Sequence, residues 1–201
     1  MKFFIVGNYG NYGKPFIDYG MKEAETAEEA DVLVFCVGVD VHPRYYDAEP
    51  CYSEFDYDVV RDEKEKQIFD AYPDKWKVGI CRGSQFLNVM NGGTLVQNLH
   101  NHAIGGEHST TFNGKQYHVT STHHQGSILT NHGKLLAEST DKLSKDYLLS
   151  PDKRVDDLPE VEAYIYPDSK TIGMQFHTEF VGENHSCAQL FRDILDQEMV
   201  A

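Results

Sequence analysis

The chain has 201 residues, with 18 Lys and Arg against 32 Asp and Glu, which gives a formal net charge of −14. A surface this acidic repels nucleic-acid phosphates and anionic membranes, so neither is expected as a partner, whereas a small substrate remains compatible. The length suits one core, and we expect residues 1–201 to form a single domain.

The termini and the cysteines favour a cytoplasmic protein. The N-terminal apolar run stops at Gly7, too early for the core of a signal peptide, and no other stretch approaches the length of a membrane span. The cysteines are widely spaced without a CxxC pair, which predicts free thiols rather than disulfides. They are Cys36, Cys51, Cys81 and Cys187.

The first half of the chain alternates short apolar runs with charged segments. The apolar runs predict buried strands over residues 3–7, 31–38 and 75–81. The charged or mixed segments predict helices over residues 26–30, 58–71 and 84–90. Loops are predicted over residues 8–13 and over residues 42–57, a long aromatic and acidic segment that we interpret as an active-site loop.

The second half is dominated by strand signals. Residues 108–140 are β-like, with a hairpin turn predicted at Asn113-Gly114, and further strands are predicted over 160–166 and 171–176. An amphipathic helix is predicted over 183–199. The pattern predicts an α/β fold with helices on both faces of the sheet and some antiparallel additions.

The segment Gly79-Ile80-Cys81-Arg82-Gly83 has the form of a nucleophile elbow, in which glycines flank a residue held in a sharp turn. The following helix would direct its N-terminal N–H groups at the thiol and favour the thiolate. The alternative is a buried structural cysteine between two turn glycines.

A thiolate nucleophile needs a base, and the base needs a group that orients it. His177 follows a predicted strand, and Glu179, two residues later, would point to the same side of an extended chain. The alternative is a partly exposed histidine at the end of a strand.

Five ordered stretches resemble the class I glutamine amidotransferase family, and most closely its γ-glutamyl hydrolase branch, the C26 cysteine peptidases. They are Gly79-Ile80-Cys81-Arg82-Gly83-Ser84-Gln85 with residues 87–89 and 92–99, Gly38-x-Asp40-Val41-x-Pro43, Arg61-Asp62-x-x-Glu65, Thr122-His123-His124-Gln125, and residues 172–179.

The resemblance implies a flavodoxin-like three-layer sandwich with a mostly parallel central sheet. It implies a catalytic triad of Cys81, His177 and Glu179, and an oxyanion hole from the amide of Arg82 and the Val37-Gly38 turn. It also implies a substrate pocket lined by Gln85, Ser121, Thr122, His123 and His124, with Gln85 holding the α-amino acid end of a glutamyl group.

Three departures from the family pattern stand out. Thr178 replaces the proline between His177 and Glu179, which predicts a looser turn. Val37 and Val39 replace two glycines beside Gly38, which predicts a more restricted oxyanion loop. The segment before this loop is short for the family.

The resemblance predicts a cysteine hydrolase that cleaves a γ-glutamyl amide through a γ-glutamyl thioester, releasing glutamate and an amine. One alternative is a glutaminase subunit that delivers ammonia to a separate synthetase, and another is an inactive binding module. The sequence names neither the amine nor the oligomeric state.

We expect no cofactor. We also expect no metal site, because the histidines form no HExxH motif and do not pair with cysteines at zinc spacing, and His100-x-His102 is only a weak ligand pair. The ones that could invite a metal interpretation are His100, His102, His108, His118, His123, His124 and His132. The run from Arg61 to Lys66 is interpreted most simply as a solvated helix face.

Overall fold

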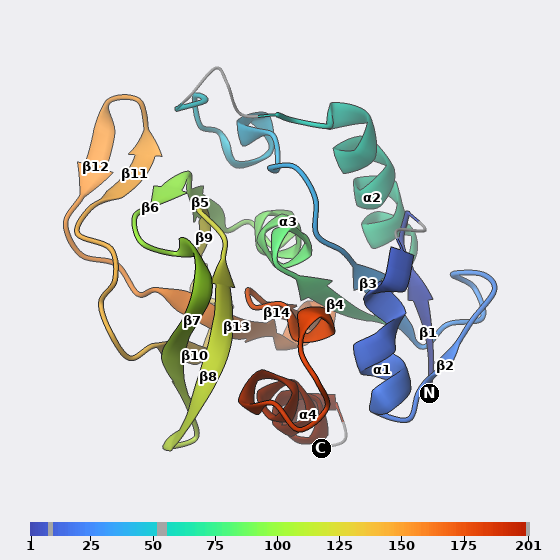
Figure 1. Cartoon of the computed structure of the whole chain (residues 1–201). Helices are drawn as coiled ribbons and strands as arrows, with labels where there is room; N and C mark the ends of the chain where they lie inside the picture. The colour runs from blue at the N-terminus through green and yellow to red at the C-terminus, as the bar shows by residue number, and fades with distance from the viewer. Residues whose placement is uncertain (8–9, 52–55, 200–201) are drawn as a thin grey trace.

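The computed structural model describes residues 1–7, 10–51 and 56–199. Nine of the described strands form one mixed sheet (Figure 1). Its parallel side has the order β2 (Lys22–Glu23), β1 (Lys2–Ile5), β3 (Val32–Phe35), β4 (Trp76–Ile80) and β14 (Thr171–Met174). Its antiparallel side continues with β13 (Val161–Tyr166), β10 (Lys134–Ser139), β7 (Ala103–Phe112) and β8 (Lys115–Thr122). The α/β class is confirmed, and the antiparallel additions supply as many strand pairs as the parallel core.

The layers follow from the period-two alternation of side chains along the central strands. On β3, Val32 and Val34 join one apolar cluster, whereas Leu33 and Phe35 join another. The first cluster contains residues of α1 (Lys14–Asp18) and α4 (Ser186–Met199), and the second contains residues of α2 (Val59–Ala71) and α3 (Arg82–Met90). Two helices therefore cover each face, with α2 and α3 above the sheet and α4 below it in Figure 1.

Local turn chemistry fixes the long hairpin of the antiparallel side. Asn113 and Gly114 both have positive φ, 49° and 76°, and they join β7 to β8 as the sequence predicts. Five short strands make two smaller sheets beside this hairpin: β5 (Thr94–Val96), β6 (Asn98–Leu99), β9 (Gly126–Ile128), β11 (Tyr147–Ser150) and β12 (Lys153–Val155).

The prediction of a helix over residues 26–30 is wrong. This segment consists of bends and turns after β2, and its small side chains Ala27 and Ala30 are buried in the second apolar cluster. Five residues are too few for a stable helix without tertiary support. A short helix that the sequence did not predict, α1, follows the loop predicted over 8–13. Residues 8–9 of that loop lie outside the described residues.

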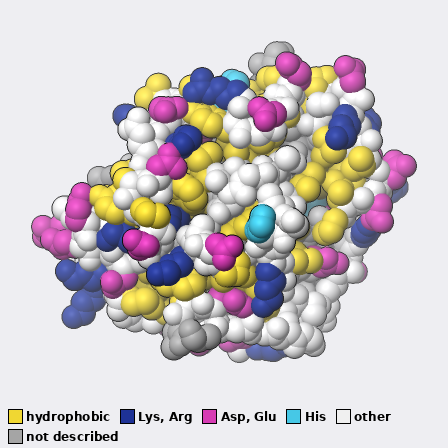
Figure 2. Space-filling view, turned by 180° about the vertical axis from the view of Figure 1, so that it is seen from behind, with side chains coloured by type: hydrophobic (Ala, Val, Ile, Leu, Met, Phe, Trp, Pro, Cys, Tyr) yellow, Lys and Arg dark blue, Asp and Glu magenta, His cyan; other side chains and the backbone are white. Residues whose placement is uncertain are grey.

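The other predicted helices and strands are present, most of them with shorter bounds, whereas the helix predicted over 84–90 begins earlier, at Arg82, and the strand predicted over 3–7 spans Lys2–Ile5. The loop predicted over 42–57 contains a 3₁₀ turn at Pro43–Tyr46, and its residues 52–55 lie outside the described part of the chain. Acidic and basic side chains are interspersed over the face shown in Figure 2. Among the described residues, no helix combines the length and apolar character needed to cross a membrane.

Candidate active site

Cys81 lies at the turn between β4 and α3, in a backbone conformation that L-residues rarely adopt. Its φ is 52° and its ψ is −111°, and its N–H donates to the carbonyl oxygen of Met174 at 2.8 Å. Such strain in a non-glycine residue persists only where the surroundings enforce it, and it is common at functional sites. The predicted elbow is therefore present, and it holds the thiol at the carboxyl end of the central strands.

The two flanking glycines allow close packing across the elbow. A Cβ atom on Gly79 would lie 2.5 Å from the carbonyl carbon of Gly83, and one on Gly83 would lie 2.1 Å from the carbonyl oxygen of Phe35. Real Cβ contacts are never this short, so only glycine lets β3, β4 and α3 approach in this way.

The N-terminus of α3 begins directly after the thiol. Cys81 is the N-cap residue and makes no side-chain capping hydrogen bond. The first N–H groups of a helix have no intrahelical acceptor, and the helix dipole adds positive potential at this end. The amide of Arg82, the first helical residue, is thus available to an anion next to Cys81.

His177 lies three residues after β14 and is held at both its backbone and its ring. Its backbone N–H donates to Thr120 Oγ1 at 2.7 Å, and its Nδ1 lies 2.7 Å from Glu179 Oε1. Burial disfavours the imidazolium, but hydrogen bonds to Cys81 and Glu179 outweigh it and raise the pKa of His177 to about 10. Cys81, His177 and Glu179 therefore form one connected group.

Phe180 and Thr178 complete the surroundings of this imidazole. The Phe180 ring stacks on His177 at a centroid distance of 4.5 Å with an interplanar angle of 5°, although Phe180 is 63% exposed. Thr178 is buried with Oγ1 3.9 Å from Cys187 Sγ on α4. These contacts hold the turn, and the looser His177–Glu179 contact predicted from the missing proline is not seen.

Arg61 holds the turn that follows β3. Its guanidinium donates to the carbonyl oxygens of Val37 and Cys36, each at 2.9 Å. In a trans peptide the N–H points opposite to the C=O, so the Gly38 N–H is directed away from Arg61. A Cβ atom at Gly38 would lie 1.9 Å from Arg61 Nη1, which explains why glycine occupies this position beside Val37.

The charged run at the start of α2 is not a solvated face, and that interpretation is wrong for three of its residues. Arg61, Asp62 and Glu65 are buried. Arg61 Nε lies 2.7 Å from Glu65 Oε1, and the buried guanidinium of Arg82 makes ion pairs with both Asp62 and Glu65. This ionic cluster ties α2 to the first turn of α3 and to the turn after β3.

Gln85 lies one helical turn after Cys81 and is buried. Its backbone N–H donates to the Cys81 carbonyl at 3.1 Å. Its side-chain amide donates to the Gln125 carbonyl at 3.3 Å and to Gln175 Oε1 at 3.2 Å. The fold thus brings Gln85 to the group that contains Cys81, and its role toward a substrate stays a prediction.

The segment from Ser121 to His124 divides into buried and accessible side chains. Ser121 is buried and donates to the His102 carbonyl at 2.6 Å, and His123 is buried with Nδ1 2.8 Å from the Gln125 carbonyl. Thr122 is exposed, whereas His124 Nε2 lies 3.1 Å from Asp40 Oδ1. Of these four residues, Thr122 is exposed and His124 half-buried, whereas Ser121 and His123 are buried with interior partners; a role for any of them toward a substrate stays a prediction.

Four residues near Cys81 were not assigned a site role from the sequence. Arg61, Thr120 and Phe180 contact the turn after β3 or His177, and Tyr12 is half-buried. Burial and the charge of Glu179 raise the pKa of Tyr12, and Cys81 contributes in the same direction. Only Arg61 lay in a recognised motif, which could have signalled its position.

Curated relatives share part of this chain. It is 34% identical to the glutamine amidotransferase-like YvdE homolog of Lactococcus lactis subsp. cremoris, over 47% of the chain and 62% of that protein. It is 37% identical to the glutamine amidotransferase PB2B2.05 of Schizosaccharomyces pombe, over 43% of the chain and 36% of that protein. The matches span less than two thirds of either relative.

Solved structures share the fold. A glutamine amidotransferase of Thermotoga maritima has a TM-score of 0.58 at 15% identity, over 100% of this chain and 85% of that one. PurLQS of Thermotoga maritima has a TM-score of 0.62 at 12% identity, over 97% of each chain. A model of the peptidase C26 family matches residues 15–179. The chain therefore belongs to the peptidase C26 family, within the class I glutamine amidotransferase-like fold.

Proposed function

We propose that this chain is a glutamine amidotransferase-type cysteine hydrolase that cleaves the γ-glutamyl amide bond of a small conjugate and releases glutamate and an amine. The observation that carries the proposal is the connected group at the elbow. Cys81 has a φ of 52° at the start of α3, and the His177 ring that it contacts lies 2.7 Å from Glu179. Family membership supports the same reaction class.

In this proposal the nucleophile is the Cys81 thiolate, paired with the His177 imidazolium. The raised pKa of His177, about 10, favours the charged ring at neutral pH, and Glu179 orients it through Nδ1. The helix N-terminus favours the thiolate beside it. The His177 ring is therefore in the charged form that can donate a proton to the leaving amine.

The reaction proceeds in two halves. Cys81 Sγ attacks the γ-carbonyl carbon, and the tetrahedral oxyanion accepts hydrogen bonds from the backbone N–H groups of Arg82 and Gly38. His177 donates its proton to the amine nitrogen as the C–N bond breaks, leaving a γ-glutamyl thioester. His177 then takes a proton from water, which attacks the thioester; glutamate leaves and the thiolate is restored.

The glutamyl end of the substrate is assigned to Gln85, with Thr122 and His124 as accessible neighbours. The buried Gln85 Nε2 donates two long hydrogen bonds, at 3.2 and 3.3 Å, and a substrate carboxylate can replace their acceptors at small cost. A site built from such polar groups distinguishes γ-glutamyl from α-glutamyl amides by their geometry.

A second candidate is a glutaminase that supplies ammonia to a synthetase, because the curated relatives are named glutamine amidotransferases. Initial rates with glutamine and with a panel of γ-glutamyl amines separate the two. The proposal predicts glutamate release from γ-glutamyl amines by the chain alone, lost in Cys81→Ser. Glutamine turnover that requires an added synthetase would support the second candidate.

An α-glutamyl amide is the matched control substrate and is expected to react at least about a hundredfold more slowly. Folded wild-type protein that releases glutamate from none of these amides would favour an inactive binding module instead.

A further inference from the structure

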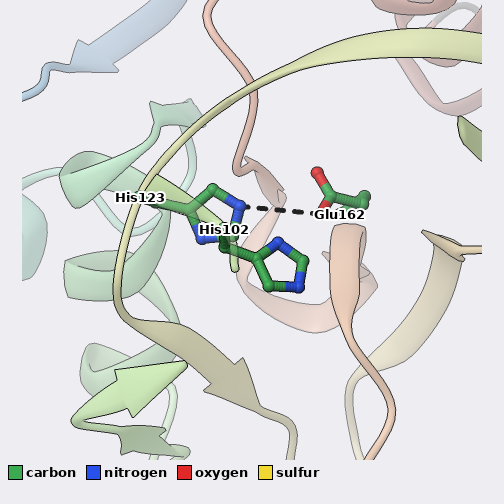
Figure 3. A group of neighbouring side chains, drawn as sticks. All are labelled: His102, His123 and Glu162. Carbon is green, nitrogen blue, oxygen red and sulfur yellow. Dashed lines mark ion pairs between the residues drawn. The ribbon is translucent and has the colours of Figure 1, made fainter. Parts of the chain in front are cut away.

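A second polar cluster lies on the antiparallel side of the sheet, outside the proposed triad. His102 precedes β7, His123 follows β8, and Glu162 lies on β13; all three are buried. One donor atom from each lies within 4.8 Å of the others. Figure 3 shows the two imidazole rings and the carboxylate turned toward a common space.

Hydrogen bonds on the outer side of His102 fix which ring nitrogen faces this space. His102 Nε2 lies 3.0 Å from Glu160 Oε2. The Glu160 carboxylate also accepts from the backbone N–H groups of Leu143 and Ser144 and from the hydroxyl of Tyr147. An ionised carboxylate only accepts, so Nε2 carries the proton and Nδ1 presents a lone pair. Nδ1 is buried without a hydrogen-bond partner among the described residues.

His123 repeats the same arrangement with its nitrogens exchanged. Its Nδ1 lies 2.8 Å from the Gln125 carbonyl, which can only accept, so Nδ1 carries the proton. Its Nε2 presents a lone pair 3.7 Å from Glu162 Oε1 and has no hydrogen-bond partner in the described part of the chain.

Glu162 supplies the third acceptor. Neither of its carboxylate oxygens makes a hydrogen bond to a described residue, in contrast with the fully bonded Glu160 nearby. His108 Nε2 forms an ion pair with Glu162 Oε1 at 2.8 Å, although outside hydrogen-bond geometry. His108 therefore offsets part of the Glu162 charge. His102 Nδ1, His123 Nε2 and Glu162 Oε2 are still buried acceptors without a hydrogen-bond donor among the described residues. Such acceptors are costly, and a cation between them removes that cost.

We propose that His102 Nδ1, His123 Nε2 and Glu162 form a binding site for a divalent transition metal ion, with Zn²⁺ as the preferred ion. Two imidazole nitrogens and one carboxylate are a donor set that zinc accepts, with one position left for His108 or water. Glu160 and the Gln125 carbonyl are the outer-shell acceptors that such ligating histidines use.

The present spacing allows binding after a small contraction. A tetrahedral zinc ion with bonds of about 2.0–2.2 Å holds its ligand atoms roughly 3.3 Å apart. The 3.7 Å between His123 Nε2 and Glu162 Oε1 is close to this separation, and the other pairs, all within 4.8 Å, would close on metal binding through side-chain rotation.

The cluster is coupled to the proposed substrate pocket through one carbonyl group. The Gln125 carbonyl accepts from both His123 Nδ1 and the Gln85 side chain. A bound ion would therefore stabilise the pocket wall behind Gln85 and would not contact the reacting atoms.

The experiment uses tag-free, full-length Cys81→Ser protein, so that the thiol near His177 cannot bind the metal. Titration with ZnCl₂ after chelator treatment is expected to give one ion per chain. Glu162→Gln in the same background is expected to weaken binding at least tenfold, and Glu160→Gln about 10- to 100-fold. His132→Ala, which changes an exposed histidine, is the matched control and should bind as tightly as the Cys81→Ser parent.

Cobalt substitution gives a readout that does not depend on the cluster variants folding. CoCl₂ added to wild-type protein should give the intense visible bands of a four-coordinate site without a thiolate-to-cobalt charge-transfer band in the near ultraviolet. Three results would each overturn the proposal. They are a thiolate band in the cobalt spectrum, no zinc binding by folded Cys81→Ser protein, and zinc binding by folded Glu162→Gln protein that is as tight as in its parent. Catalytic failure of the chain would leave this result unaffected.

Discussion

At the scale of single residues, the position of Cys81 depends on the absence of a side chain at the flanking glycines, Gly79 and Gly83. Gly83 contacts the backbone of β3 so closely that any side chain there must displace α3 or the strand. The elbow pattern alone indicates only that glycine lets the backbone turn. The structure adds a stricter requirement, because the lack of a side chain at Gly79 and Gly83 lets β3, β4 and α3 pack against one another.

Gly83→Ala should therefore lower the free energy of unfolding by about 3 kcal/mol, because overpacking against backbone cannot be relieved by side-chain rotation. Urea unfolding measures this loss. Gly182→Ala is the control, since a Cβ atom at that position would have no neighbour within 4 Å, and should change stability little. Equal stability of the two variants would contradict the packing described here.

The His177 imidazole depends on Glu179 in both orientation and charge. Glu179→Gln removes one of the two groups that raise the pKa of His177, so that pKa should fall from about 10 toward its ordinary value. NMR titration of the ring follows the pKa, and kcat for a γ-glutamyl amide should fall about 10²- to 10⁴-fold. An unchanged pKa with full activity would exclude the proposed role of Glu179.

At the scale of elements, buried charges join α2 to α3 in addition to the apolar cluster that the two helices share. Arg82 pairs with Asp62 and Glu65, and Arg61 pairs with Glu65 while it holds the turn after β3. The cluster therefore fixes both backbone segments that are proposed to form the oxyanion hole.

Removing one partner leaves an uncompensated buried charge, so Glu65→Ala should destabilise the fold by about 3–5 kcal/mol. Glu63→Ala on the same helix is the matched control; its exposed pair with Arg44 should contribute less than about 1 kcal/mol. Denaturant unfolding of both variants gives the comparison, and similar losses would show that the buried cluster does not hold α2 to α3.

At the scale of the whole molecule, the triad network links stability to pH. The pKa of His177 is raised from 6.5 to about 10, so its contribution is fully present below about 6.5 and is lost as pH rises through about 10. The stability advantage of wild type over Glu179→Gln should follow that trend. Unfolding free energies at neutral and strongly alkaline pH measure it; an advantage that grows with pH would have the wrong sign.

Most of the fold could be predicted from local signals. Some elements are determined by residues that are adjacent in the sequence. They are the apolar parallel strands, the Asn113-Gly114 turn and the amphipathic C-terminal helix. The segment 26–30 could not be predicted in this way, because its alanines are positioned by packing against strands rather than by helix propensity.

The candidate site could be predicted only where its residues are close to one another in the sequence. The Cys81 elbow and the His177–Glu179 pair are short motifs, and the structure brings them together. The ionic partners of Arg82, the stacking of Phe180 and the convergence of His102, His123 and Glu162 join distant segments. The expectation of no metal site rested on ligand spacing, which says nothing about histidines that meet across different strands.

The central claim is that Cys81 attacks a γ-glutamyl carbonyl. Acid quenching of the enzyme during turnover of a γ-glutamyl amide, followed by intact-mass and peptide mass spectrometry, tests it most directly. We expect a γ-glutamyl adduct on the peptide that contains Cys81. Its yield should be larger in a variant in which hydrolysis of the thioester, the step that depends on His177, is slowed, and Cys81→Ser should give no adduct. Turnover without that adduct, or an adduct on Cys36, Cys51 or Cys187 instead, would contradict the account.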